Sequence, residues 1–139
     1  MKYFFDRNIA VGLVGALGHI YPGHNIVHIN SDSRFTPTSE DVDIIRALSQ
    51  ETPRPVFLSS DIKMAARRPH ERAALASSGL TVVFFRKVFH NTSMPDQAIK
   101  AIAFWPKLVE LTHGCPQPTA FEITAKGKVN RVCLTQNLV

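Results

Sequence analysis

The stretch FLSSDIKMAARRPHERAALASSGLTVVFF, residues 57–85, contains the pattern that decides the fold. It begins within a short apolar run, 54–60, that ends in serines and is typical of a buried strand. The segment 69–79 is predicted to be a helix, because proline suits a first helical turn and Gly79 suits the position after the last. Residues 80–85 are β-branched and aromatic, as in a second strand. A strand–helix–strand unit of this kind predicts a parallel sheet.

The same alternation continues on both sides of this unit. The other predicted elements are a strand at 1–5, a helix at 9–17, a strand at 25–29, a helix at 39–50 capped by Ser39, a helical region at 95–112 and two short strands within 120–134. Pro106 is expected to kink or break the helical region. The last two strands should form a hairpin or a pair of edge strands. We therefore predict an α/β fold with a mainly parallel sheet.

The length and composition of the chain predict one globular domain spanning residues 1–139. A chain of this size buries enough surface for a core without staples. No apolar run approaches the roughly 20 residues that a membrane span needs, so no membrane association is expected. Nothing at the N-terminus resembles a signal peptide, and Cys115 and Cys133 are expected to be reduced thiols. These features predict a cytoplasmic location.

The charge of the chain favours an anionic partner, because the formal net charge is +5 at pH 7. Seven of the eleven acids lie in the first 61 residues: Asp6, Asp32, Glu40, Asp41, Asp43, Glu51 and Asp61. A basic segment, KMAARRPHER, follows them directly. Its cations are Lys63, Arg67, Arg68 and Arg72, which we expect either to follow an RNA backbone or to form a solvated helix face. Arg7 is a further candidate for binding phosphate or pairing with an acid.

Three of the acids are predicted to meet at one edge of the sheet. Asp6 ends the first strand and Asp61 follows the strand at 54–60, and parallel sheets place ligands at the carboxyl ends of their strands. Asp41 shares a helical face with apolar residues that pack on the sheet, so it should point toward the same edge. Alternatively, each acid is simply solvated, or stabilises a helix dipole.

Three carboxylates at one place repel each other unless a cation neutralises them. Their hard oxygen atoms favour Mg²⁺ or Mn²⁺, ions that activate water and hold a phosphate during hydrolysis. Asn8 adds a neutral polar group two residues after Asp6. Ser59 and Ser60, which precede Asp61, are candidates for orienting a ligand or a water molecule. We take Ser60 as the catalytic serine candidate.

The chain resembles the PIN-domain superfamily, and most closely its VapC-type toxin-related branch. The matching segments are FFDRNI (4–9), GHNIVHI (23–29), TSEDVDII (38–45), the run from Ser59 to Phe85, WPKLVEL (105–111) and AFEI (120–123). The resemblance implies a flavodoxin-like three-layer α/β/α sandwich and Mg²⁺- or Mn²⁺-dependent ribonuclease activity. It also implies that the metal ligands are Asp6, Asp61 and Asp41, with Asp43 or Glu40 as alternatives to the last.

The chain departs from this family pattern at the fourth acid, which in many members follows the next strand. Here no acid occurs until Asp96, and Asp32 is another possible edge acid. A degenerate module that binds RNA or a protein without cleavage is therefore an alternative. A phosphoacceptor signalling domain is a third, since it too has acids on one rim of such a sheet and a lysine after the fourth strand, where Lys87 lies here. The resemblance also implies a cognate antitoxin as partner and a homodimer.

Overall fold

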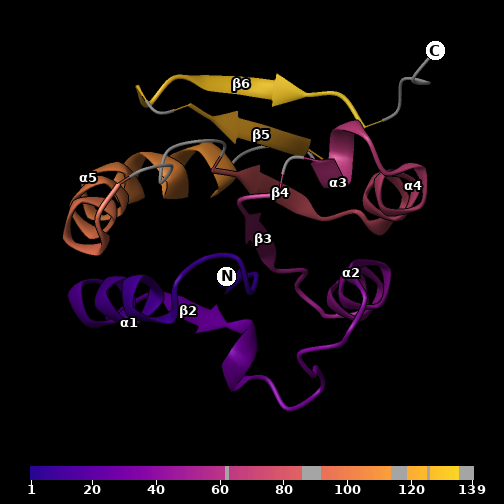
Figure 1. The fold of residues 1–139 in the computed structure, drawn as a ribbon, viewed down its shortest axis with the longest axis horizontal. Coiled ribbons are helices and arrows are strands. Elements are labelled where there is room, and N and C mark those ends of the chain that lie inside the picture. The colour runs from indigo at the N-terminus through magenta and orange to yellow at the C-terminus, as the bar shows by residue number, and fades with distance from the viewer. Residues whose placement is uncertain (62, 86–91, 114–118, 125, 135–139) are drawn as a thin grey trace.

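The computed structural model describes residues 1–61, 63–85, 92–113, 119–124 and 126–134 (Figure 1). Strands and helices alternate along most of them. In chain order the elements are β1 Lys2–Phe5, α1 Val11–Ile20, β2 Asn25–His28, the 3-10 helix η1 Ile29–Ser31, α2 Asp41–Ser49, β3 Val56–Ser59, α3 Lys63–Ala66, α4 Pro69–Ser78, β4 Thr81–Phe84, α5 Met94–His113, β5 Thr119–Ile123 and β6 Val129–Val132. Lys87 and Cys115 lie outside the described residues.

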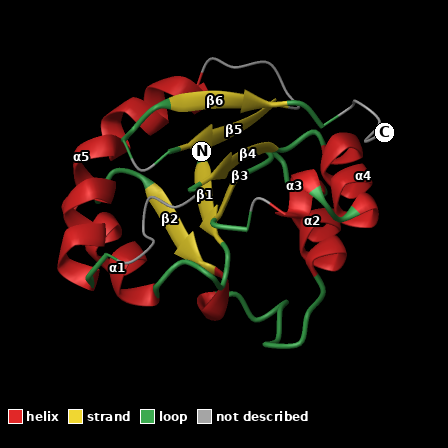
Figure 2. Cartoon of the chain, turned by 45° about the horizontal axis from the view of Figure 1, so that its top comes forward, coloured by secondary structure: helices red, strands yellow, loops and turns green. Residues whose placement is uncertain are grey.

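The strands form one sheet in the order β2-β1-β3-β4-β5-β6. β1 to β5 are parallel, and β6 pairs antiparallel with β5 in a hairpin. Helices α1 and α5 cover one face of the sheet, and α2, α3 and α4 cover the other (Figures 1 and 2). The three-layer α/β/α architecture and the C-terminal hairpin are therefore as predicted.

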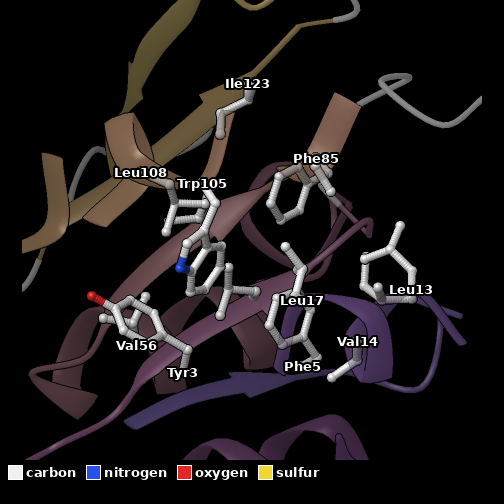
Figure 3. Packing of buried hydrophobic residues seen from close by; sticks show 14 of the residues in the cluster. Tyr3, Phe5, Leu13, Val14, Leu17, Val56, Phe85, Trp105, Leu108 and Ile123 are labelled. Atoms are coloured by element: carbon white, nitrogen blue, oxygen red, sulfur yellow. The ribbon is translucent and has the colours of Figure 1, made fainter. Parts of the chain in front are cut away.

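Alternate residues of each strand pack into two separate cores. Tyr3 and Phe5 of β1 face α1 and α5, whereas Phe4 between them packs on the opposite side. Trp105 of α5 lies at the centre of the first core, with its ring 4.8 Å from that of Tyr3 in an edge-on arrangement (Figure 3). Because both faces of the central strands β1, β3 and β4 are buried, their sequences show continuous apolar runs without polar alternation.

The alternation of side chains along each strand also determines which way the polar residues at the strand ends point. Phe4 and Phe57 belong to the core beneath α2 and α4. Two residues further along, Asp6 and Ser59 lie on that same face, at the carboxyl ends of β1 and β3. The fold thus brings two polar groups together beside the N-terminal ends of α2 and α4.

The predicted signals for α4 are confirmed. Pro69 occupies its first turn, and Gly79 follows it with a φ of 72°, in the left-handed region that glycine adopts without strain. The first helix begins and ends later than predicted, since α1 extends from Val11 to Ile20 and not from 9 to 17. The short helix α3 was not predicted.

The cap predicted for α2 is wrong. Glu40 holds the cap position and makes no side-chain cap hydrogen bond. The hydroxyl of Ser39 instead accepts a hydrogen bond from the Thr36 N–H at 2.8 Å, within the loop that precedes the helix. Ser39 therefore stabilises a local turn, which competes with capping for the same oxygen.

Of the kink or break predicted at Pro106, the break does not occur, because α5 continues through this residue as one helix. Proline has no N–H to donate to the carbonyl four residues earlier, which is that of Ile102. The hydroxyl of Tyr21, which follows α1, donates to the Ile102 carbonyl at 2.9 Å. A side chain from another element thus replaces the missing helical hydrogen bond.

No helix in the described ranges combines the length and apolar character needed to cross a membrane.

Candidate active site

Asp6 is the most buried acid of the sheet edge, with 1% of its surface exposed. Its Oδ1 accepts a hydrogen bond from the Arg7 N–H at 2.8 Å. Its Oδ2 accepts from the Ser59 hydroxyl at 3.1 Å and from the Asn8 side-chain amide at 3.4 Å. Both oxygens are therefore held in place by neighbours from β1 and β3.

Ser59, and not Ser60, is the serine that contacts Asp6. The Ser59 Oγ atom also accepts the Asp61 N–H at 3.1 Å, so it joins two of the predicted metal ligands. Ser60 contacts Asn8 through its backbone N–H, at 3.0 Å from Oδ1. Strand alternation thus puts Ser59 on the face of Asp6, whereas the role predicted for Ser60 stays a prediction.

Three further acids surround the guanidinium of Arg68. Its Nη1 atom lies 2.8 Å from Oδ2 of Asp61, 3.6 Å from Oδ2 of Asp41 and 3.5 Å from Oε2 of Glu71. Asp61 follows β3, Asp41 begins α2, and Glu71 lies in the first turn of α4. A single nitrogen thus brings together carboxylates from three separate segments.

Glu71 was not among the residues singled out from the sequence. The fourth acid was sought after β4, whereas Glu71 precedes that strand. A signal was available, because a helix that follows a parallel strand begins at the strand's carboxyl end. Any acid in the first turn of α4 therefore lies at the same edge as Asp61, by the argument that placed Asp41.

The acids of the site influence each other electrostatically. Burial raises the pKa of Asp6, and the negative charge of Asp41 raises it further. Burial likewise raises the pKa of Asp41, with an added contribution from Asp61. The pKa of Glu71 is also raised, first by burial and then by Asp41. The nearby charges of Asp61 and Glu71 hold the pKa of Arg68 above its ordinary value.

A groove of about 1340 Å³ opens between α2 and α4 at this edge of the sheet. Its acidic lining residues are Asp6, Glu40, Asp41, Asp43, Asp61 and Glu71. The wall also carries basic side chains, among them those of Arg46, Arg67 and His70. The groove is therefore acidic at the sheet edge, with basic side chains beside the acids.

Two other acids considered from the sequence lie outside the groove. Asp32 pairs with Arg34 at 2.7 Å, and Arg34 also pairs with Glu51 at 3.0 Å. Asp96 accepts a hydrogen bond from the Ser93 hydroxyl at 2.9 Å at the start of α5. Neither acid joins the cluster around Arg68.

The predicted basic residues are placed differently from one another. The Arg7 guanidinium donates to the carbonyls of Pro37 and Ser39, at 2.6 and 2.5 Å, and so holds the loop before α2. Lys63 is exposed, and its backbone N–H donates to Oδ1 of Asp61 at 3.2 Å. Arg67 is exposed on the groove wall. Lys63 and Arg67 therefore present their charges to solvent beside the site.

The expectation that Arg72 contacts RNA is corrected. Only 8% of its surface is exposed. Its Nε donates to the Leu134 carbonyl at 3.3 Å and its Nη2 to the Cys133 carbonyl at 3.2 Å. The side chain anchors the segment after β6 on α4, because the chain passes there within reach of its guanidinium.

The donor set suits a divalent cation, although the side chains are not arranged as ligands around one. Among the described residues, no group of three His, Cys, Asp or Glu side chains stands ready to hold a metal ion. The carboxylates of Asp41, Asp61 and Glu71 nevertheless supply the hard oxygen atoms that Mg²⁺ and Mn²⁺ prefer. Oε2 of Glu71 is buried and has no hydrogen-bond partner in the described structure. The residues thus supply the donor atoms of such an ion, but not its coordination geometry while Arg68 lies among them.

Comparison with known protein families identifies the family of the chain. A family model described as a PIN like domain matches residues 1–87, which include β1 to β4 and all the acids that line the groove. Curated proteins give no match, and neither do solved structures. The matched segment covers more than half of the chain and has the nuclease-type α/β/α fold described above. The chain therefore belongs to the PIN-like domain family.

Proposed function

We propose that this protein is an endoribonuclease that depends on Mg²⁺ or Mn²⁺ and hydrolyses RNA phosphodiester bonds. The observation that carries the proposal is the clustering of acids from four separate segments at one end of a single groove. Asp6, Asp41, Asp61 and Glu71 would repel one another strongly without a cation. Membership of a family with a nuclease-type fold supports the same conclusion.

Each residue has a distinct role in this proposal. Asp6, Asp41 and Asp61 would hold the ion, as predicted from the sequence. When bound, the ion would supply an activated water and stabilise the charge that develops on the phosphate. Asn8 and Ser59 fix the orientation of Asp6 through the hydrogen bonds described above. Arg67, exposed on the groove wall, attracts the RNA backbone.

We further propose that the protein is the toxin of a toxin–antitoxin pair and acts in the cytoplasm. This part rests on the resemblance to VapC-type proteins, which also suggests a cognate antitoxin partner and a homodimer. Its test is co-expression with the product of a neighbouring reading frame. Recovery of growth and formation of a stable complex are expected, and growth unaffected by the protein alone would contradict it.

The enzymatic proposal is tested by RNA cleavage with purified variants. Asp6→Asn and Asp61→Asn should lower the rate by about 100-fold or more, because each removes a charged ligand of the ion. EDTA should abolish cleavage, and Mn²⁺ should restore it. Asp96→Asn, an acid outside the groove, is the matched control and should cleave at the wild-type rate. Persistent cleavage by both site variants would reject the assignment.

A second function is favoured by the position of Arg68. Its guanidinium already neutralises three acids. A PIN-like module with this arrangement could bind RNA or a protein without cleaving it. RNA binding without cleavage in saturating Mn²⁺, by wild-type protein and by a variant lacking Arg68, is the result that would favour this function over the first.

A further inference from the structure

Arg68 occupies the centre of the acid cluster, and this has a consequence for metal binding. We propose that Arg68 is a built-in substitute for the metal, so that a divalent ion binds only by displacing its guanidinium from Asp41, Asp61 and Glu71. This inference rests on the proposed function, because it concerns how the metal of that function reaches its ligands. It adds Glu71 to the ligands and makes Arg68 a competitor of the ion.

The contact distances put the guanidinium where an ion bound by the same three oxygens would lie. The three carboxylate oxygens lie 2.8 to 3.6 Å from the Nη1 atom of Arg68. An Mg²⁺ ion at this position would draw the oxygens inward by about 0.7 to 1.5 Å, to its bond length of about 2.1 Å. A guanidinium nitrogen and a divalent cation cannot share one position, and their charges repel.

Arg68 is able to leave the cluster without disturbing the core. Its side chain is 44% exposed, and it belongs to the residue that precedes the first turn of α4. The ion pairs that the described structure gives it are all with these three acids. Rotation of the side chain toward solvent therefore breaks only contacts that the incoming ion replaces.

Glu71 is the acid most dependent on this exchange. Its Oε2 atom is buried and accepts no hydrogen bond in the described structure, so its charge is offset chiefly by Arg68 at 3.5 Å. A metal ion in place of the guanidinium would satisfy this oxygen. The displaced guanidinium would remain on the groove wall, where it adds a positive charge for RNA.

The first test measures Mn²⁺ binding by calorimetry in the absence of RNA. Arg68→Gln should bind Mn²⁺ about tenfold more tightly than wild type, because a competing positive charge is removed from the ligands. Arg67→Gln is the matched control, with the same charge change one residue away, and should stay within about twofold. Glu71→Gln should weaken binding. Equal affinities of the two arginine variants would overturn the proposal.

The second test needs no substitution and therefore does not depend on a variant that folds. The Nε–H signals of ¹⁵N-labelled arginine are followed by NMR while Mg²⁺ is added to the wild-type chain. The Arg68 signal should shift in step with binding, and the Arg67 signal should not. An unchanged Arg68 signal at saturating Mg²⁺ would overturn the proposal.

These results separate the inference from the proposed function. Competition between Arg68 and the ion, with no cleavage of RNA, would leave the inference standing and reject the enzyme. Cleavage that requires Mn²⁺, with no effect of Arg68 on Mn²⁺ affinity, would reject the inference alone. Absence of divalent-ion binding in both wild type and Arg68→Gln would reject both.

Discussion

The hydroxyl of Ser59 is the group on which the geometry of the acidic site depends most. It donates to Asp6, accepts from Asp61 and lies 3.1 Å from the side-chain amide of Asn8. It is fully buried, so no solvent molecule takes over these contacts without rearrangement. Its removal should therefore affect both stability and the position of Asp6.

Ser59→Ala should lower the free energy of unfolding by about 1 to 3 kcal/mol, because several buried polar groups lose a partner. Ser60→Ala is the matched control and should change it by less than about 0.5 kcal/mol, since the hydrogen bond of Ser60 to Asn8 uses its backbone N–H. Urea denaturation of the three proteins measures both values. Equal losses in the two variants would show that Ser59 has no special place in the site.

Asp6 should make stability depend on pH. Burial raises its pKa above the ordinary value of 3.8, so the folded chain binds this proton more strongly than the unfolded chain does. The stabilisation is present below 3.8 and is lost as the pH rises through the raised value. Asp6→Asn should therefore be more stable than wild type at pH 7.5, and its advantage should shrink toward pH 4.

Thermal denaturation across this pH range, without metal, measures the difference. Asp96→Asn removes one negative charge at an exposed position on α5 and controls for the change in net charge. A wild-type chain more stable than Asp6→Asn at pH 7.5 would contradict the prediction, because it would mean that the charged carboxylate is favoured in the fold.

Some residues of the site could be inferred from the sequence and others could not. Asp6, Asp41 and Asp61 line one groove. In a parallel sheet, the carboxyl ends of the strands and the first turns of the helices that follow them meet at one edge. The roles of these three acids as ligands stay predictions. Ser59 could not be chosen over Ser60, because β3 is buried on both faces and shows no alternation. Arg72 could not be excluded, since its partners come 61 and 62 residues later.

The link between α1 and α5 shows how an element can tolerate an unfavourable residue. Pro106 leaves the carbonyl of Ile102 without its helical donor, and Tyr21 supplies a hydroxyl instead. The sequence predicted a kink or a break because proline normally ends or bends a helix. It could not show that Tyr21, which lies 81 residues before Ile102, would donate a hydrogen bond to this carbonyl.

A double-mutant cycle tests this link. Tyr21→Phe should lower the free energy of unfolding by about 1 kcal/mol, because the Ile102 carbonyl loses its donor. In a Pro106→Ala background the restored N–H can serve that carbonyl, so Tyr21→Phe should then cost much less. Additive effects of the two substitutions would show that Tyr21 and Pro106 act independently.

At the scale of the whole molecule, the chain carries a net charge of +5, yet six acids and four arginines among the described residues line the groove. The acids gather at the sheet edge, while Arg46 and Arg67 line the wall beside them. In the proposed function, RNA would meet the cations of the wall, and a metal ion would offset the acids. RNA binding should accordingly weaken as salt is added.

Arg67→Gln should make RNA binding less sensitive to salt. Loss of one phosphate contact should reduce the slope of log affinity against log salt by about 0.7 for a single strand. Fluorescence anisotropy with a labelled RNA in EDTA measures the slope. Arg131→Gln, the same change on β6 and away from the groove, should leave the slope unaltered. Equal slopes for wild type and Arg67→Gln would place the RNA elsewhere.

The acids of the groove and the last elements of the fold lie in different parts of the chain, and this affects how the sequence can diverge. Every carboxylate that lines the groove precedes residue 87, whereas α5, β5 and β6 follow it. Those later elements contribute Trp105 and its neighbours to the core over β1. Substitutions after residue 87 should therefore act mainly on the stability of the fold, because none of the groove carboxylates lies there. Homologues should accordingly vary more in this part than at the acids of the groove.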